Sequence, residues 1–219
     1  MRNDGVAPGI HTWRKRGGER RPLASDHRLR SLRTFEDHLY FIGAPKMPSG
    51  SRAGIARVAK DAGEPEQLVA PDPMRDIHPF EVFGRHVYYR VNTDLRSAYE
   101  LHRIRIDTRT DEVIVPEARD VPHVFAVDAD GIFGFVQRND GNTELVRIPL
   151  EGGRTLGLMT FSPSAGSKLG PLATDDQAIY WTVAEEECAY MRQLSIDLPA
   201  TCRYRYRMRV FRMDKASIE

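Results

Sequence analysis

The sequence predicts an all-β fold, a β-propeller or a partial propeller of about four blades, each built from four antiparallel strands. Apolar runs are short, Gly and Pro fall between them, and no long stretch has the apolar period of a helix. Two sequence patterns also recur about every 45 residues. A recurring unit of this length that holds four strands has the size of a propeller blade.

The first pattern is an apolar residue followed by aromatic residues, and it marks the second strand of each blade. Its copies begin 45 to 48 residues apart. They are Leu39-Tyr40-Phe41, Val87-Tyr88-Tyr89, Ile132-Phe133-Gly134 and Ile179-Tyr180-Trp181. An apolar residue lies seven positions before each copy and begins the first strand: Leu32, Phe80, Phe125 and Leu172.

The second pattern is an apolar residue, any residue, an arginine and another apolar residue, and it marks the third strand. Its copies are Ile55–Val58, Leu101–Ile104, Leu145–Ile148 and Val210–Met213. The first three arginines are 44 to 46 residues apart, but the last interval is 65 residues. The long interval indicates an insertion in the last blade, over residues 182–209. Fourth strands are expected at Gln67–Ala70 and Glu112–Val115.

The hairpin between a second and a third strand is clearest over residues 131–153. The apolar run Ile132–Val136 is followed by Asn139-Asp140-Gly141-Asn142 and then by the apolar run Leu145–Ile148. Asn, Asp and Gly tolerate the positive φ angles of tight hairpin turns. The segment therefore predicts two antiparallel strands.

These registers divide the chain into a half blade, three blades and an incomplete last blade. The expected boundaries are 1–28, 29–73, 74–120, 121–160 and 161–219. Residues 1–28 form the outer half of a blade, or else a solvated basic tail. The N-terminal strands then complete the last blade, or a protein partner or second chain completes the propeller. A third alternative is a segment of a larger propeller with a misassigned start.

Two sequences of the unit resemble the repeat of YWTD-type propellers and of many uncharacterised bacterial propellers. They are Asp175 followed by Ile179-Tyr180-Trp181, and Arg147–Gly153, which reads Arg-Ile-Pro-Leu-Glu-Gly-Gly. The resemblance extends over residues 10–214 and implies a propeller. The chain departs from the pattern at Phe35 and Phe83, where the family has Asp. No functional residue carries over, because the motif is structural.

The polar residues of the pattern have expected structural roles. Asp128 and Asp175 cap the turn between the first two strands. Each motif arginine pairs with that Asp or lies along an aromatic face. Gly152-Gly153 permit the turn into the outer strand.

Composition and charge argue against nucleic-acid and membrane partners. The 219 residues include 32 Lys and Arg and 31 Asp and Glu, a formal net charge of +1, so no basic field favours a nucleic acid or an anionic membrane. No apolar run is long enough to span a bilayer, and the N-terminus shows no apolar secretory segment. We expect a cytoplasmic protein, or a secreted or periplasmic one if the start lies upstream.

His78 and His123 are the candidate metal ligands. Each lies nine residues before an apolar-aromatic sequence, at the entry to a first strand. A divalent cation held by the two imidazoles and by a carboxylate such as Asp76 or Asp120 is one interpretation. A pair of rim histidines is the other, because the equivalent positions of the remaining blades supply no third ligand.

Cys188 and Cys202 are the only cysteines, and both lie in the insertion. If the insertion is an elongated hairpin, its arms bring the two cysteines near each other. A disulfide there stabilises by ~3 kcal/mol through loop closure and requires an oxidising compartment. Two reduced thiols in the cytosol are the alternative.

Basic and aromatic residues alternate in Arg203-Tyr204-Arg205-Tyr206, a candidate binding segment. The pattern is typical of single-stranded nucleic-acid binding. It is equally typical of a half-exposed strand, whose charge Glu185–Glu187 neutralise across the hairpin. The balanced net charge favours the strand.

No catalytic motif is present: there is no Gly-x-Ser-x-Gly, no Walker loop and no His-Glu-x-x-His. The predicted function is therefore a non-catalytic propeller that binds or scaffolds a partner and needs no cofactor. The alternative is a propeller hydrolase or lactonase with a divalent cation held in the channel by His78 and His123.

Overall fold

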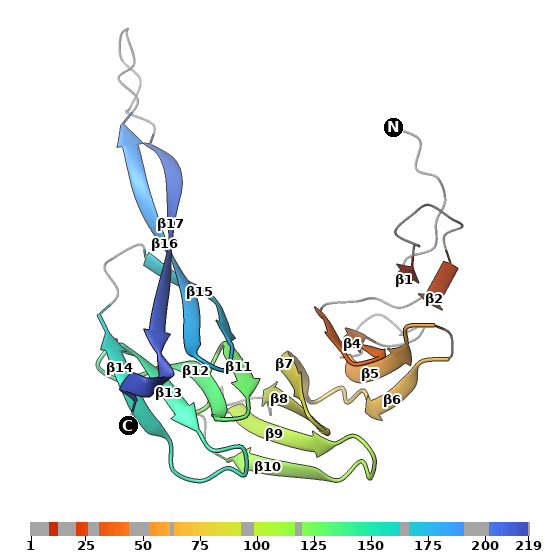
Figure 1. Ribbon diagram of the computed structural model, residues 1–219. Coiled ribbons are helices and arrows are strands. Elements are labelled where there is room, and N and C mark those ends of the chain that lie inside the picture. The colour runs from red at the N-terminus through yellow and green to blue at the C-terminus, as the bar shows by residue number, and fades with distance from the viewer. Residues whose placement is uncertain are drawn as a thin grey trace, which may run out of the picture. The chain divides into compact units, whose positions relative to one another are not determined.

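The computed structural model describes residues 9–12, 21–25, 31–43, 53–61, 64–92, 99–116, 120–162, 167–190 and 202–218 (Figure 1). Within these ranges the chain forms strands β1–β17 and one 3-10 turn, η1 (Lys215–Ser217). None of its helices there has the length and apolar character that crossing a membrane requires.

The strands form five antiparallel sheets, and each sheet follows the order of the chain. One sheet holds β3 (Ser31–Phe35), β4 (His38–Gly43), β5 (Gly54–Ala59) and β6 (Glu66–Val69). The next holds β7 (Asp76–Phe83), β8 (His86–Asn92), β9 (Tyr99–Arg105) and β10 (Asp111–Val115). A third holds β11 (Phe125–Asp128), β12 (Gly131–Gln137), β13 (Thr143–Ile148) and β14 (Leu156–Phe161).

The remaining two sheets have fewer strands. One holds β15 (Ser167–Thr174), β16 (Ala178–Tyr190) and β17 (Cys202–Asp214), and the other holds β1 (Gly9–Thr12) and β2 (Arg21–Ser25). Successive antiparallel meanders of this kind are propeller blades. The predicted class, an all-β propeller of about four blades, is confirmed.

The chain divides into two compact units. The first contains Met1–Val121 with Glu151–Gly153, and the second contains Pro122–Leu150 with Arg154–Glu219. Each has its own apolar core. The first core includes Tyr40, Ile42, Ile55, Phe80 and Tyr89, and the second includes Phe133, Phe135, Leu145, Ile179 and Trp181.

Two of the turns between first and second strands are held by the predicted aspartates, Asp128 and Asp175. Asp128 Oδ1 accepts a hydrogen bond from the backbone N–H of Asp130 at 2.8 Å. Asp175 Oδ1 accepts from the N–H groups of Gln177 at 2.9 Å and Ala178 at 2.8 Å. Both carboxylates therefore cap their turns, as the sequence predicts.

Each motif arginine lies directly opposite an aromatic residue of the second strand. The pairs are Tyr40 with Arg57, Tyr88 with Arg103, Phe133 with Arg147, and Tyr180 with Arg212. Of the two expected roles, Arg212 has the aromatic one, with its guanidinium 5.9 Å from the centre of the Tyr180 ring. Among the described residues, no ion pair joins a motif arginine to a turn aspartate. Arg57 and Arg103 pair instead with Glu66 and Glu112 of the fourth strands, each at 2.6 Å.

Third and fourth strands share an irregular register. In each of the three four-stranded sheets, the motif arginine lies opposite the fourth-strand residue nine positions later. Two positions after that residue, the fourth strand has a residue with no partner in the third strand, and we call it the skipped residue: Leu68, Ile114 and Leu158. Such a bulge kinks the outer strand and increases its twist. The pair β1–β2 has the same register, with Thr12 opposite Arg21 and Leu23 skipped.

The blade boundaries expected from the sequence, at 28/29, 73/74, 120/121 and 160/161, stay a prediction.

The insertion continues the last hairpin. β16 and β17 pair without interruption from Ala178 opposite Asp214 to Tyr190 opposite Cys202. The insertion is therefore an elongated two-stranded arm at its described positions.

Candidate binding site

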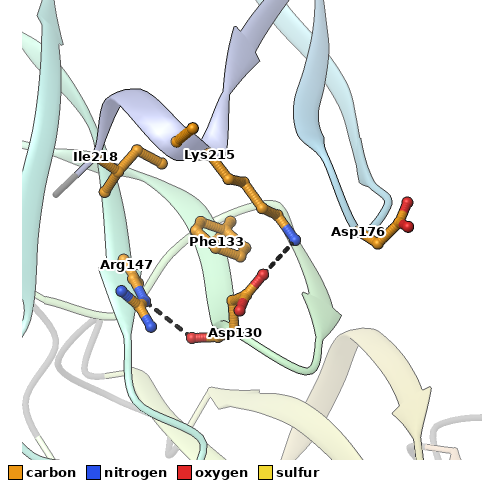
Figure 2. Close-up of a pocket in the computed structure, with 7 residues that line it drawn as sticks. Asp130, Phe133, Arg147, Asp176, Lys215 and Ile218 are labelled. Carbon is orange, nitrogen blue, oxygen red and sulfur yellow. Dashed lines mark hydrogen bonds and ion pairs between the residues drawn. The ribbon is translucent and has the colours of Figure 1, made fainter.

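A pocket of about 350 Å³ lies in the second unit, beside the 3-10 turn η1 (Figure 2). Seven residues line it: Asp130, Phe133, Arg147, Asp176, Lys215, Ala216 and Ile218. They come from three neighbouring parts of the fold, namely the β11–β12 turn with β12 and β13, the β15–β16 turn, and η1. The pocket is partly open to solvent.

Turn and strand geometry fixes the position of each lining group. The Asp128 cap places Asp130 at the tip of the β11–β12 turn. The backbone N–H of Lys215 donates to the carbonyl of Gln177 at 2.9 Å, which ties η1 to the β15–β16 turn. Arg147 Nε donates to the carbonyl of Asp130 at 2.8 Å, so β13 and the β11–β12 turn are held together.

Lys215 is the central charge of the pocket. Its side chain is 10% exposed, and Nζ lies 2.5 Å from Asp128 Oδ2 and 2.8 Å from Asp130 Oδ2. Partial burial disfavours the ammonium, but the hydrogen bonds to the two carboxylates outweigh burial and raise the pKa of Lys215. The hydrogen bond from Lys215 also lowers the pKa of Asp130. Lys215 therefore stays protonated, and the carboxylates of Asp128 and Asp130 neutralise its charge.

Two charges of the pocket remain available. In the described part of the chain, the Asp176 carboxylate has no ion-pair partner, and neither has the Arg147 guanidinium. Figure 2 shows them on either side of the Lys215–Asp130 pair. The lining residues include no Ser, Thr, Cys or His, and the charged groups among them are the carboxylates of Asp130 and Asp176, the Arg147 guanidinium and the Lys215 ammonium.

A second cluster of ionisable groups lies in the first unit around His102, which is 3% exposed. Its Nε2 lies 3.0 Å from Glu100 Oε2, and its Nδ1 lies 3.3 Å from the carboxylate of Asp111. The imidazole stacks on Tyr89 with ring centroids 5.2 Å apart. Burial disfavours the imidazolium, but the two carboxylates outweigh it and raise the pKa of His102. Both ring nitrogens are occupied, so the cluster is structural.

The predicted metal ligands lie in different units. His78 is exposed on β7 in the first unit, and His123 is exposed in the segment before β11 in the second. Among the residues the structure describes, no group of three or more His, Cys, Asp or Glu side chains is arranged to hold a metal. The His78–His123 site stays a prediction.

The predicted residues of the insertion lie on its elongated arm. Cys188 pairs with Tyr204, and Cys202 pairs with Tyr190, so the cysteines are offset by two positions along the ladder. Such diagonal neighbours are about 7–8 Å apart, whereas Cα atoms of bridged cysteines are usually about 4.4–6.8 Å apart. Arg203, Tyr204, Arg205 and Tyr206 lie on β17. The disulfide and the binding role of these four residues stay predictions.

The pocket was not predicted from the sequence. Its central ion pairs join Lys215 to residues 85 and 87 positions earlier, and no local spacing signals a contact of that range. The Asp128 cap is the one partial signal, because a capped turn fixes the next aspartate two residues on.

Comparison with protein-family models gives no match, and comparison with curated proteins gives none either. Solved structures do match. A mutant puromycin hydrolase complexed with PGG aligns with a TM-score of 0.57 at 13% identity, over 91% of this chain and 29% of that one. A TolB from Agrobacterium tumefaciens aligns with a TM-score of 0.52 at 13% identity, over 80% and 57%.

Prolyl oligopeptidase B from Galerina marginata aligns with a TM-score of 0.52 at 16% identity, over 75% of this chain and 24% of that one. The chain therefore spans less than two thirds of each of these proteins. At these identities the likeness shows the fold, a β-propeller.

Proposed function

We propose that this chain is a β-propeller module that acts by binding, and that the η1 pocket holds a small dipolar ligand such as the ends of a short peptide. The observation that carries the proposal is the pair of available charges, Arg147 and Asp176, on either side of a neutralised Lys215. Arg147 suits a carboxylate or carbonyl acceptor, and Asp176 suits an ammonium or amide donor.

The charge state of Lys215 supports binding over catalysis. Lys215 is held as an ammonium by Asp128 and Asp130, so it does not serve as a base or a nucleophile at neutral pH. The hydrolase names of two structural neighbours belong to proteins of which this chain spans less than a third. Membership of a YWTD-like family is part of the same proposal.

Calorimetric titration of the full chain with alanyl-alanine and longer alanine peptides tests the proposal. Binding is expected, and it is expected to weaken about tenfold in Arg147→Gln, because a charge-assisted hydrogen bond contributes about 1.5–3 kcal/mol. Arg105→Gln is the matched control, since Arg105 is an exposed arginine of the first unit paired with Asp107 at 2.8 Å.

A parallel assay measures turnover of an aryl ester, a lactone and a peptide anilide, with and without added divalent cations. No hydrolysis above the buffer rate is expected. Hydrolysis that is lost in Asp176→Asn, or that requires a stoichiometric metal lost in His78→Ala, overturns the proposal.

A further inference from the structure

Among the described strands, β17 has no neighbour at its outer edge, whereas the third strands β5, β9 and β13 each have one. The sheets that begin with β3, β7 and β11 each have a fourth strand, but β15–β17 has three. Among the described strands, none pairs with β17 on the side away from β16. Such an edge presents backbone donors and acceptors that favour addition of an extended segment.

Side-chain exposure differs between β17 and the third strands of the four-stranded sheets. Three residues occupy the place two positions before the motif arginine, and each is 0% exposed: Ile55, Leu101 and Leu145. The equivalent residue of β17 is Val210, which is 73% exposed. Met208, two positions earlier in the chain, is 64% exposed. β17 therefore carries an apolar surface at the position that is buried in the complete sheets.

The register of the complete sheets shows what belongs beside β17. Where a tyrosine lies opposite the motif arginine, the fourth strand places a glutamate on the arginine's other side: Tyr40–Arg57–Glu66 and Tyr88–Arg103–Glu112. Where a phenylalanine lies opposite, as in Phe133–Arg147–Leu156, the fourth strand has a leucine. In the last sheet Tyr180 lies opposite Arg212. By the same pattern, the fourth-strand residue opposite Arg212 is expected to be a glutamate.

The next three positions of the fourth strand are also defined. The skipped residue is apolar and buried or half-buried in all three sheets, and the residue after it is Val or Met. The observed sequences are Glu66-Gln67-Leu68-Val69, Glu112-Val113-Ile114-Val115 and Leu156-Gly157-Leu158-Met159. A segment that completes the last sheet therefore reads Glu-x-Leu/Ile-Val.

We propose that the outer edge of β17 binds an extended Glu-x-Leu/Ile-Val segment of a second polypeptide, antiparallel to β17, with its glutamate on Arg212 and its apolar residues over Val210. This interaction goes beyond the pocket and rests on separate residues. Arg212 now pairs with Asp214 at 2.7 Å on the surface, and the segment's glutamate takes the place that Glu66 has beside Arg57.

Two other occupants fit the edge less well. The N-terminal strand β2 has the fourth-strand register, but it already pairs with β1, and Arg21 stands where the glutamate belongs. A second copy pairing through its own β17 brings together two strands that each contain five arginines and one aspartate. Both arrangements place like charges opposite one another.

Hydrogen exchange of the full chain with the octapeptide Glu-Pro-Glu-Gln-Leu-Val-Ala-Pro, the sequence around β6, tests the proposal. At saturating peptide, exchange is expected to slow about tenfold at those amides of residues 208–212 that face away from β16, as they become paired. The control peptide has Lys in place of the second Glu and is expected to bind about tenfold more weakly. Arg212→Gln is expected to abolish the difference between the peptides, and Arg105→Gln to preserve it.

Three results overturn the proposal. Equal slowing by both peptides removes the role of the glutamate and Arg212. No slowing by either peptide removes the edge as a binding site. Protection of the outward-facing amides of 208–212 before peptide is added assigns the edge to the N-terminal strands if light scattering gives a monomer, and to a second copy if it gives a dimer. None of these results affects the titration of the η1 pocket, which depends on Arg147.

Discussion

His102 has a carboxylate at each ring nitrogen, so only its protonated form suits the site. A neutral imidazole would direct a lone pair at Glu100 or at Asp111, each within 3.3 Å. The flanking groups are Glu100 on β9, Asp111 on β10 and Tyr89 on β8, and the charge of Arg75 also acts on Asp111. The packing of the first unit around His102 therefore requires the imidazole to be protonated.

Stability of the first unit is expected to fall as the pH rises above 6.5. The pKa of His102 is raised above its usual 6.5, so its contribution is complete below pH 6.5 and is lost as the pH rises through the folded-state value. The variant His102→Gln should be about 1–3 kcal/mol less stable at pH 6, because a buried charged hydrogen bond is lost. Urea unfolding at pH 6 and pH 9 measures it, and an undiminished pH slope in the variant would contradict the assignment.

Lys215 is the residue on which the η1 pocket depends. Replacing it with Met leaves Asp128, whose side chain is 14% exposed, without its countercharge. We expect Lys215→Met to destabilise the second unit by about 2–4 kcal/mol, since breaking a largely buried ion pair exposes the cost of burying the remaining charge. Lys168→Met, at an exposed lysine of β15, is the control in urea unfolding. Equal effects of the two substitutions would show that the Lys215 pairs contribute little.

The segment between β13 and β14 depends on two adjacent glycines, Gly152 and Gly153. Gly152 and Gly153 both have positive φ, of 82° and 107°. A Cβ at Gly152 would lie 2.7 Å from the carbonyl oxygen of Ile114, whereas a Cβ at Gly153 meets nothing within 4 Å. The two glycines therefore separate the cost of backbone conformation from the cost of a steric contact with β10.

Gly153→Ala should cost about 1 kcal/mol through its positive φ alone. Gly152→Ala should cost about 1–3 kcal/mol more, because Ile114 must also shift. Thermal unfolding of the two variants measures the difference. If Gly153→Ala is the more damaging, the contact with Ile114 does not govern this turn.

The second and third strands were predictable from sequence because each carries a pattern of apolar, aromatic and arginine residues that recurs along the chain. Each apolar-aromatic sequence lies on β4, β8, β12 or β16, and each arginine motif lies on β5, β9, β13 or β17. The partner of the arginine was not predictable. Its glutamate lies nine residues later across an irregular register, and a bulge leaves no signal in an alternating pattern.

The candidate site was less predictable than the fold. Lys215 meets Asp128 and Asp130 only because η1 returns to the β11–β12 turn, a contact between distant segments. His102 likewise had no distinguishing spacing, since Glu100 and Asp111 appear as ordinary surface acids in the sequence. Residue type and period indicate the core. The Lys215 cluster depends on two turns that meet in space, and the His102 cluster depends on the pairing of β9 with β10.

The whole molecule consists of two units with separate cores, so its unfolding should not be a single two-state transition. Scanning calorimetry is expected to show two transitions. His102→Gln should lower the temperature of one and Lys215→Met that of the other, because each residue belongs to a different unit. A single transition that both variants shift equally would mean that the units unfold together.

The arginines of β17 have a consequence for how the protein behaves in solution. Charged residues on an open strand edge keep that edge from pairing with itself, and their mutual repulsion weakens with ionic strength as the Debye length falls from about 8 Å at 0.15 M salt to about 3 Å at 1 M. Added salt should therefore promote association of this chain, whereas dilute buffer should keep it dispersed. Light scattering across a sodium chloride series measures this, and Arg209→Glu, which introduces an acid on the same strand, should promote association even in dilute buffer.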